Sequence, residues 1–241
     1  MIKAKKSLSQ NFLIDKNISK KIIKEIKIKN QLIIEIGPGY GFLTDYILKE
    51  KPKKLILIEK DNFLFKFLKD KYKNFNEVKI INKDVLKFNF INYKKSIIIS
   101  NLPYNISTKI ILNLLNKNSI IKEMLFMVQK EVAVKFDYNL LDMNKYKFFT
   151  KLYSKYKRCF DVPPTVFKPK PKVYSTVVKF TLNKKNVNSA KAKDFSDKIF
   201  SNIRKKIKNN IKIDKLENSV ILSKRVDQLT IKKLLYIYNF F

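Results

Sequence analysis

Three glycines within five residues constrain this chain most, because its 241 residues contain no other glycine. They lie in EIGPGYG (35–41), between the apolar run QLIIEI (31–36) and the segment FLTDYILK (42–49). The apolar run predicts a buried strand and the segment after the glycines predicts a helix. A glycine-rich turn in that position lets a nucleotide-like ligand lie against the backbone. The sequence therefore predicts a ligand-binding turn at Gly37, Gly39 and Gly41.

The spacing of these glycines argues against a nicotinamide cofactor. The dinucleotide fingerprint G-x-G-x-x-G requires its third glycine at position 42, which is Phe42 here. A plain tight turn between strand and helix is the alternative. The absence of glycine from the rest of the chain disfavours it, because glycine is retained where a backbone needs unusual freedom or lacks room for a side chain.

Further apolar runs alternate with helical patterns along the first 182 residues. Strands are predicted at 53–61, 78–84, 96–100 and 123–129, and helices at 15–28 (with Asp15 as a possible cap), 62–72, 106–115 and 130–136. This alternation predicts a Rossmann-like α/β fold with a parallel, doubly wound sheet. Two more strand-like stretches follow Tyr153 around the proline-rich segment 162–172, the second of them at 173–182.

The last part of the chain has a different composition. The Asn/Lys-rich stretch 183–189 predicts a linker, and residues 190–241 combine helical periodicity with many lysines. We therefore expect two domains, an α/β domain at 1–182 and a small, basic, helical C-terminal domain at 190–241.

The net charge of +33 favours a polyanion as partner, nucleic acid first and an anionic membrane second. Only three of the 53 basic residues are arginine, and the chain is also rich in Ile, Asn and Phe. AT-rich codons encode all of these abundant residues, so codon drift is an equally good source of the lysine excess.

Other counts exclude whole classes of site. The chain has no histidine and one cysteine, Cys159, which excludes an intrachain disulfide and a zinc site with several thiolates and favours no metal site at all. No apolar run reaches the roughly 18 residues of a membrane span, and the first ten residues lack the apolar core of a signal peptide. These features predict a cytoplasmic protein without a membrane partner.

Polar residues follow the predicted strands. Glu59 ends the second strand about 20 residues after the glycines, where an acid binds the two hydroxyls of a ribose. Asp84 ends the third strand, where it could contact the adenine of a cofactor. Taken singly, either acid is more often a surface or helix-capping residue; the ordered set is what indicates a site at the carboxyl ends of the strands.

NLPYN (101–105) directly follows the fourth strand. The side-chain oxygen of Asn101 and a nearby backbone carbonyl could accept the two N–H donors of an adenine amino group, and Tyr104 could stack on the base. Phe167 could form a second aromatic wall for a flipped-out base. The alternatives are a structural turn with a buried tyrosine, and a core aromatic beside a proline turn.

Together these motifs resemble those of the ribosomal RNA adenine N6-dimethyltransferases. The resemblance spans nearly all of the first 182 residues and rests on SQNFLID (9–15), EIGPGYGFLT (35–44), IEKD (58–61), SNLPYNIST (100–108), MVQKEVA (127–133) and VPPTVFKPKPKVYS (162–175). IRKKIKNNI (203–211) and SKRVDQLT (223–230) resemble its C-terminal signatures more weakly. The resemblance implies a methyltransferase that uses S-adenosyl-L-methionine. It places Asn11, Leu13, Gly37, Gly39, Glu59, Asp84 and Asn101 at the cofactor, and Asn101, Tyr104 and Phe167 around the target base.

Within the family, the resemblance is to the branch that dimethylates two adjacent adenines in a hairpin loop of small-subunit rRNA. Gly-Pro-Gly (37–39) and Val-Pro-Pro (162–164) favour this branch. It implies a pre-small-subunit ribosomal particle as partner and a monomeric enzyme. The alternatives are the antibiotic-resistance type, which modifies large-subunit rRNA, and a non-catalytic assembly factor. The chain departs from the family at Leu8-Ser9, at Tyr146-Lys147-Phe148, and in a C-terminal motif rich in lysine instead of arginine.

Overall fold

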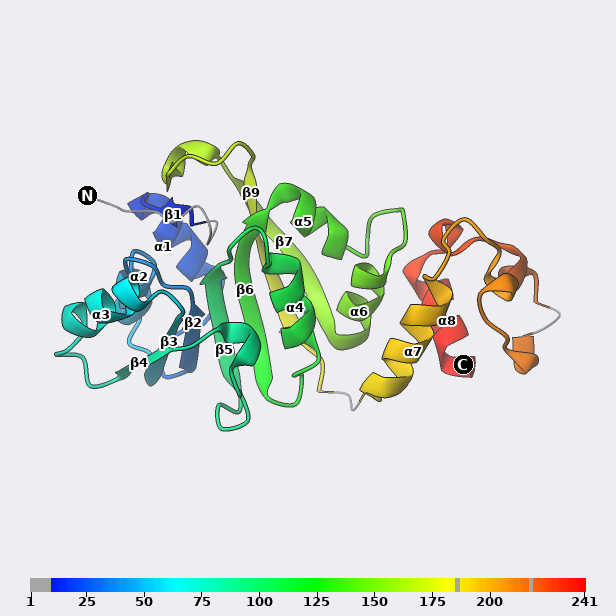
Figure 1. The fold of residues 1–241 in the computed structure, drawn as a ribbon, viewed down its shortest axis with the longest axis horizontal. Coiled ribbons are helices and arrows are strands. Elements are labelled where there is room, and N and C mark those ends of the chain that lie inside the picture. Colours follow the sequence, from blue (N-terminus) through cyan, green and yellow to red (C-terminus); the bar gives the residue numbers. More distant parts are fainter. Residues whose placement is uncertain (1–9, 185–186, 217–218) are drawn as a thin grey trace.

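The computed structural model describes residues 10–184, 187–216 and 219–241. Within them, seven strands form one sheet in the order β4-β3-β2-β5-β6-β9-β7 (Figure 1). The strands are β2 (Leu32–Ile36), β3 (Lys54–Glu59), β4 (Val78–Asn82), β5 (Ser96–Asn101), β6 (Ile121–Gln129), β7 (Ser154–Val162) and β9 (Ser175–Leu182). Strands β4, β3, β2, β5 and β6 run parallel to one another, whereas β9 is antiparallel to both β6 and β7. The α/β prediction is confirmed, with β9 and β7 added at one edge through antiparallel pairing.

The central strands are apolar along their length because helices cover both faces of the sheet. Successive side chains of a strand point to opposite faces, so Ile33 packs with one core cluster and Ile34 with the other. Helices α1, α2 and α3 contribute to the first cluster, and α4, α5 and α6 to the second or to its border. The bounds of these helices are α1 (Lys16–Lys24), α2 (Thr44–Lys49), α3 (Asn62–Lys71), α4 (Ser107–Leu115), α5 (Lys130–Phe136) and α6 (Lys145–Tyr153).

The predicted helix at 15–28 is shorter than expected. Asp15 caps it as predicted, since its carboxylate accepts from the backbone N–H of Ile18 at 2.8 Å. The helix ends at Lys24, and the chain then turns toward β2 with Asn30 in the left-handed conformation (φ 60°). Ile26 and Ile28 are still buried, so their apolar spacing extended the helical pattern beyond the helix.

Two segments far apart in sequence form a second, two-stranded sheet. β1 (Phe12–Leu13) pairs antiparallel with β8 (Phe167–Lys168), and a short 3₁₀ turn, η3 (Pro164–Val166), precedes β8. The backbone N–H of Ile14 extends the ladder to the carbonyl of Val166. The N-terminal segment is thus tied to the proline-rich segment between β7 and β9.

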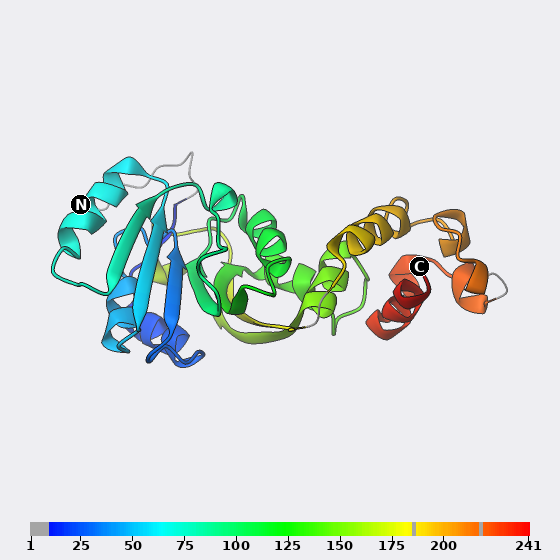
Figure 2. The same ribbon diagram turned by 90° about the horizontal axis from the view of Figure 1, so that it is seen from below.

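The C-terminal region begins with α7 (Ser189–Ile199) and ends with α8 (Ile231–Phe240). The predicted helical character of the C-terminal region is confirmed, although between α7 and α8 the chain forms only short 3₁₀ turns, at Ile207–Asn209, Asp214–Leu216, Val220–Ser223 and Val226–Gln228. A buried Ile, Leu or Val side chain of each turn packs into a shared core. Figures 1 and 2 show this region at the opposite end of the molecule from α3.

Helix α6 links the two parts of the fold. Phe148 of α6 contacts Phe195 of α7 and Tyr238 of α8, with ring centroids 5.2 and 5.4 Å apart. Phe148 belongs to the predicted first domain, but it fills the core of the C-terminal region. The division into domains 1–182 and 190–241 stays a prediction. Residues 185–186 of the predicted linker and the Leu8-Ser9 departure lie outside the described residues.

Lys147, in the segment that departs from the family pattern, is buried and holds the loop before α6. Its ammonium group donates to the carbonyls of Leu140, Leu141 and Asp142. Burial lowers the pKa of Lys147. No helix in the described part of the chain is both long and apolar enough to cross a membrane.

Candidate cofactor and substrate site

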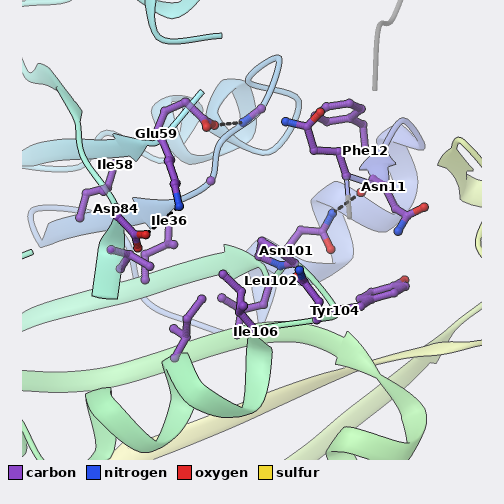
Figure 3. A pocket seen from close by; sticks show the side chains of 18 of the residues that line it. Asn11, Phe12, Ile36, Ile58, Glu59, Asp84, Asn101, Leu102, Tyr104 and Ile106 are labelled. Atoms are coloured by element: carbon purple, nitrogen blue, oxygen red, sulfur yellow. Dashed lines mark hydrogen bonds and ion pairs between the residues drawn. The ribbon is translucent and has the colours of Figure 1, made fainter. Parts of the chain in front are cut away.

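A pocket opens where the parallel strands end, the edge at which open α/β sheets bind ligands. Its walls come from the residues that follow β2, β3, β4 and β5, and from the segment before β1 (Figure 3). Seven of the nine predicted site residues line it: Asn11, Gly37, Gly39, Glu59, Asp84, Asn101 and Tyr104. They come from the ends of four strands and from the N-terminal segment, so only the folded sheet brings them together.

Gly37 gives the ligand access to the backbone. It has a φ of +62°, and a Cβ added to it would meet no atom within 4 Å. A side chain there would be strained and would project into open space. A Cβ on Gly39 would instead strike the ring of Phe12, at 2.7 Å, so this glycine serves packing. Gly39 nevertheless lines the pocket together with Gly37, and the place of these glycines at a cofactor stays a prediction.

Glu59 is buried at the end of β3 and held by backbone donors. The N–H of Asp61 donates to Oε1 at 2.8 Å and the N–H of Gly39 donates to Oε2 at 3.3 Å. Burial raises the pKa of Glu59, and these two N–H donors oppose the shift. The carboxylate is thus held in place at the pocket wall, where its two oxygens could accept from two neighbouring hydroxyls.

Asp84 follows β4, the neighbour of the strand that ends in Glu59, and it caps a 3₁₀ turn, η2 (Val85–Lys87). Its Oδ1 accepts from the N–H of Leu86 at 2.9 Å, and its Oδ2 pairs with the ammonium group of Lys60 at 2.9 Å. The hydrogen bond from Lys60 lowers the pKa of Asp84. Asp84 is therefore a helix-capping residue, as the alternative interpretation of the sequence held, and it also lines the pocket.

Asn101 ends β5 and is fixed from the N-terminal segment. Its side-chain Nδ2 donates to the backbone carbonyl of Asn11 at 2.7 Å (Figure 3). Since the amide nitrogen is occupied, the orientation of the carboxamide is set. Within the described residues, Oδ1 accepts no hydrogen bond, which leaves it as an acceptor toward the pocket.

Tyr104 is held by its hydroxyl. The hydroxyl lies 2.7 Å from Oγ of Ser175, which is fully buried at the start of β9. Burial raises the pKa of Tyr104, so the phenol stays neutral. The ring therefore stands at a fixed place in the pocket wall, available for stacking.

The remaining predicted residues, Leu13 and Phe167, do not line the pocket. They are register partners in the β1–β8 ladder, each 3% exposed, and both belong to the core cluster on the α1–α3 face. In this structure Phe167 is a core aromatic beside a proline turn, and its place around a target base stays a prediction.

Several pocket residues were not predicted from the sequence. Phe12, Lys60 and Lys83 line the pocket, as do the apolar side chains of Ile36, Ile58, Val85, Leu102 and Ile106. The sequence could have predicted the apolar members, since each lies within two residues of a predicted site residue. The partner of Tyr104, Ser175, ends the motif 162–175, but nothing in the sequence pairs it with Tyr104, 71 residues away.

A model of the ribosomal RNA adenine dimethylase family matches residues 1–241. The chain belongs to this family. It is therefore an rRNA adenine dimethylase, a methyltransferase, as the motifs predicted. The ribosomal RNA small subunit methyltransferase A of Hydrogenobaculum sp. is 37% identical over 242 residues, which cover 99% of this chain and 94% of that protein.

Solved structures agree on the fold. The crystal structure of a dimethyladenosine transferase from Plasmodium falciparum superposes with a TM-score of 0.79 at 24% identity, covering 95% of this chain and 100% of that chain. The 23S rRNA methyltransferase ErmE superposes with a TM-score of 0.77 at 19% identity, covering 95% and 98%. At these identities the likeness concerns the fold alone.

Proposed function

We propose that this chain uses S-adenosyl-L-methionine to dimethylate the N6 amino groups of two adjacent adenines in a hairpin loop of small-subunit rRNA. The substrate is a pre-small-subunit particle, late in assembly, and the enzyme acts as a monomer in the cytoplasm. The observation that carries the proposal is the fixed carboxamide of Asn101, whose acceptor oxygen shares one pocket with the buried carboxylate of Glu59. The oxygen of Asn101 suits an amino group that is to be methylated, and the carboxylate of Glu59 suits the ribose of a cofactor.

The pocket fits the proposed cofactor. Glu59 would accept from the two ribose hydroxyls, and Gly37 would let the amino-acid part lie against the backbone. Asp84 would accept from the adenine amino group, for which the exposed side chain of Lys60 can move aside. When bound, the cofactor supplies an electrophilic methyl group.

On the substrate side, Asn101 Oδ1 would accept one N–H of the target adenine. Leu102 lines the same pocket, and its backbone carbonyl could accept the other. These acceptors would draw the nitrogen toward a tetrahedral geometry, which would free its lone pair for direct in-line attack on the methyl group of the cofactor, with the neutral thioether as leaving group. Tyr104 would stack on the ring. A methylated nitrogen is acidic enough to lose its proton to water, so the scheme requires no side chain as general base.

The basic C-terminal region is the proposed contact with rRNA. Lys205, Lys206 and Lys208 are exposed around the turn at Ile207, which is itself fully buried. The turn thus presents three ammonium groups on a rigid base. Lysines can bind phosphates as point charges, although without the two-pronged geometry of arginine.

Two alternatives remain testable. The large-subunit type shares the fold, as ErmE illustrates, but the similar protein of Hydrogenobaculum carries a small-subunit name. A non-catalytic assembly factor would not need the pocket to be intact. Mass spectrometry of both rRNAs from cells with and without the gene separates the proposal from these alternatives. Loss of dimethyladenosine from the small-subunit rRNA supports the proposal, and its loss from the large-subunit rRNA supports the first alternative. No change in either rRNA supports a non-catalytic factor.

A further inference from the structure

The end of α3 holds the outer part of the glycine turn. Tyr72, which ends this helix, is 4% exposed, and its hydroxyl lies 2.6 Å from Oδ1 of Asp45 and 3.1 Å from the carbonyl oxygen of Gly41. The ammonium group of Lys71 donates to Oδ2 of Asp45 at 2.8 Å and to the carbonyl of Tyr40 at 3.1 Å. Two consecutive side chains therefore bind both the glycine turn and the first turn of α2.

Gly41 fits closely against Tyr72. It has a φ of +78°, and a Cβ added to it would collide with the tyrosine hydroxyl. Its carbonyl also accepts from the backbone N–H of Asp45 at 3.0 Å. Neither Gly41 nor Tyr72 can shift without displacing the other, so α3 fixes the position of the turn.

The same turn shapes the pocket. The N–H of Gly41 donates to the carbonyl of Pro38 at 2.9 Å, and the next residue, Gly39, donates to Glu59. At its other end, α3 is capped by Asp61, whose own N–H donates to Glu59. The helix thus connects the two elements that we assign to the cofactor, at its beginning and at its end.

We propose that Tyr72 and Lys71 are positioning residues for the cofactor. They hold the glycine turn in the shape in which Gly37 and Glu59 bind S-adenosylmethionine. Neither side chain lines the pocket, so they act on cofactor affinity and not on the transfer step. This inference rests on the proposed function.

Tyr72→Phe tests the inference, because it removes the hydroxyl and keeps the buried ring. The lost hydrogen bonds should weaken S-adenosylmethionine binding about 3- to 10-fold in calorimetry. The KM for the cofactor should rise by the same factor with kcat unchanged at saturation. Tyr156→Phe is the matched control: Tyr156 is also buried and also donates to a backbone carbonyl, but that carbonyl belongs to Ala133, at 2.8 Å, and not to the glycine turn.

The outcomes separate this inference from the proposed function. If the wild-type protein binds no S-adenosylmethionine, the proposed function fails. If it binds and the two Phe variants have equal affinity, the inference fails alone. Should Tyr72→Phe not fold, Lys71→Gln decides, with a loss of up to about fivefold expected. Its control is Lys73→Gln, which removes only the exposed pair with Asp70; equal affinities of these two variants overturn the inference.

Discussion

Asn101 and Asn11 are joined by a 2.7 Å hydrogen bond that spans 90 residues of sequence, from the side-chain amide of one to the backbone carbonyl of the other. The bond ties the N-terminal segment to the end of β5. It also decides which atom of the Asn101 carboxamide is left for a ligand. A single contact therefore links the proposed cofactor side of the pocket to its proposed base side.

Glu59→Ala should weaken S-adenosylmethionine binding by about 1.5–3 kcal/mol, the usual worth of hydrogen bonds to a charged group. Calorimetry measures the change. Glu131→Gln is the control, since Glu131 forms an exposed pair with Lys135 on α5, away from the pocket. Wild-type affinity in Glu59→Ala, or tight binding of NAD by the wild-type protein, would contradict the cofactor assignment.

Replacing Lys205, Lys206 and Lys208 with Gln should weaken rRNA binding and flatten its salt dependence. Each lost phosphate contact lowers the log–log slope by roughly 0.7–0.9. The control replaces Lys66 and Lys69 on α3 and Lys73 just after it, which makes the same charge change at the other end of the molecule. Equal slopes for the two triple variants would mean that the C-terminal lysines are solvated surface residues left by codon drift.

Glu35 should make stability depend on pH. It is buried beneath the glycine turn and accepts from the hydroxyl of Thr44 at 2.7 Å, and burial raises its pKa to about 8 from 4.5. At a pH between these two pKa values, Glu35 is ionised in the unfolded chain but still protonated in the folded protein. The free energy of unfolding should therefore fall as pH rises from about 5 to 8, by up to about 1.4 kcal/mol per pH unit.

Glu35→Gln removes this titration and can still accept from Thr44. Urea unfolding between pH 5 and 8 should show a flatter profile for the variant than for the wild-type protein. Parallel profiles would show that Glu35 ionises normally in the folded state.

Tyr104→Phe and Ser175→Ala should behave alike. Each removes one side of the 2.7 Å contact that anchors the ring, and each keeps the ring itself. Stacking requires the ring and not the hydroxyl, so both variants should keep most of the methyl-transfer rate, whereas Tyr104→Ala should lose it. A Phe variant as slow as the Ala variant would show that the hydroxyl acts in the reaction.

Patterns local in sequence predicted most of the fold and the walls of the pocket. The Ile-rich strands, the glycine turn and the polar residue after each strand can be recognised within about ten residues, and parallel strands must bring their carboxyl ends together. Partners that tertiary packing selects could not be predicted this way. The carbonyl of Asn11, the hydroxyl of Ser175 and the hydroxyl of Tyr72 each meet the site from a distant segment.

Asn101→Ala should reduce methyl transfer far more than rRNA affinity. Its acceptor oxygen matters most as the adenine nitrogen becomes tetrahedral, so the interaction is stronger in the transition state than in the bound substrate. Removing one preorganised polar contact of this kind costs on the order of 100-fold in rate. The measurement is single-turnover transfer of labelled methyl to small-subunit particles, with rRNA binding measured alongside. Because Asn101 also holds Asn11, S-adenosylmethionine affinity serves as the control for a displaced N-terminal segment. Transfer at the wild-type rate would mean that the loop after β5 is structural and that the proposed mechanism is wrong.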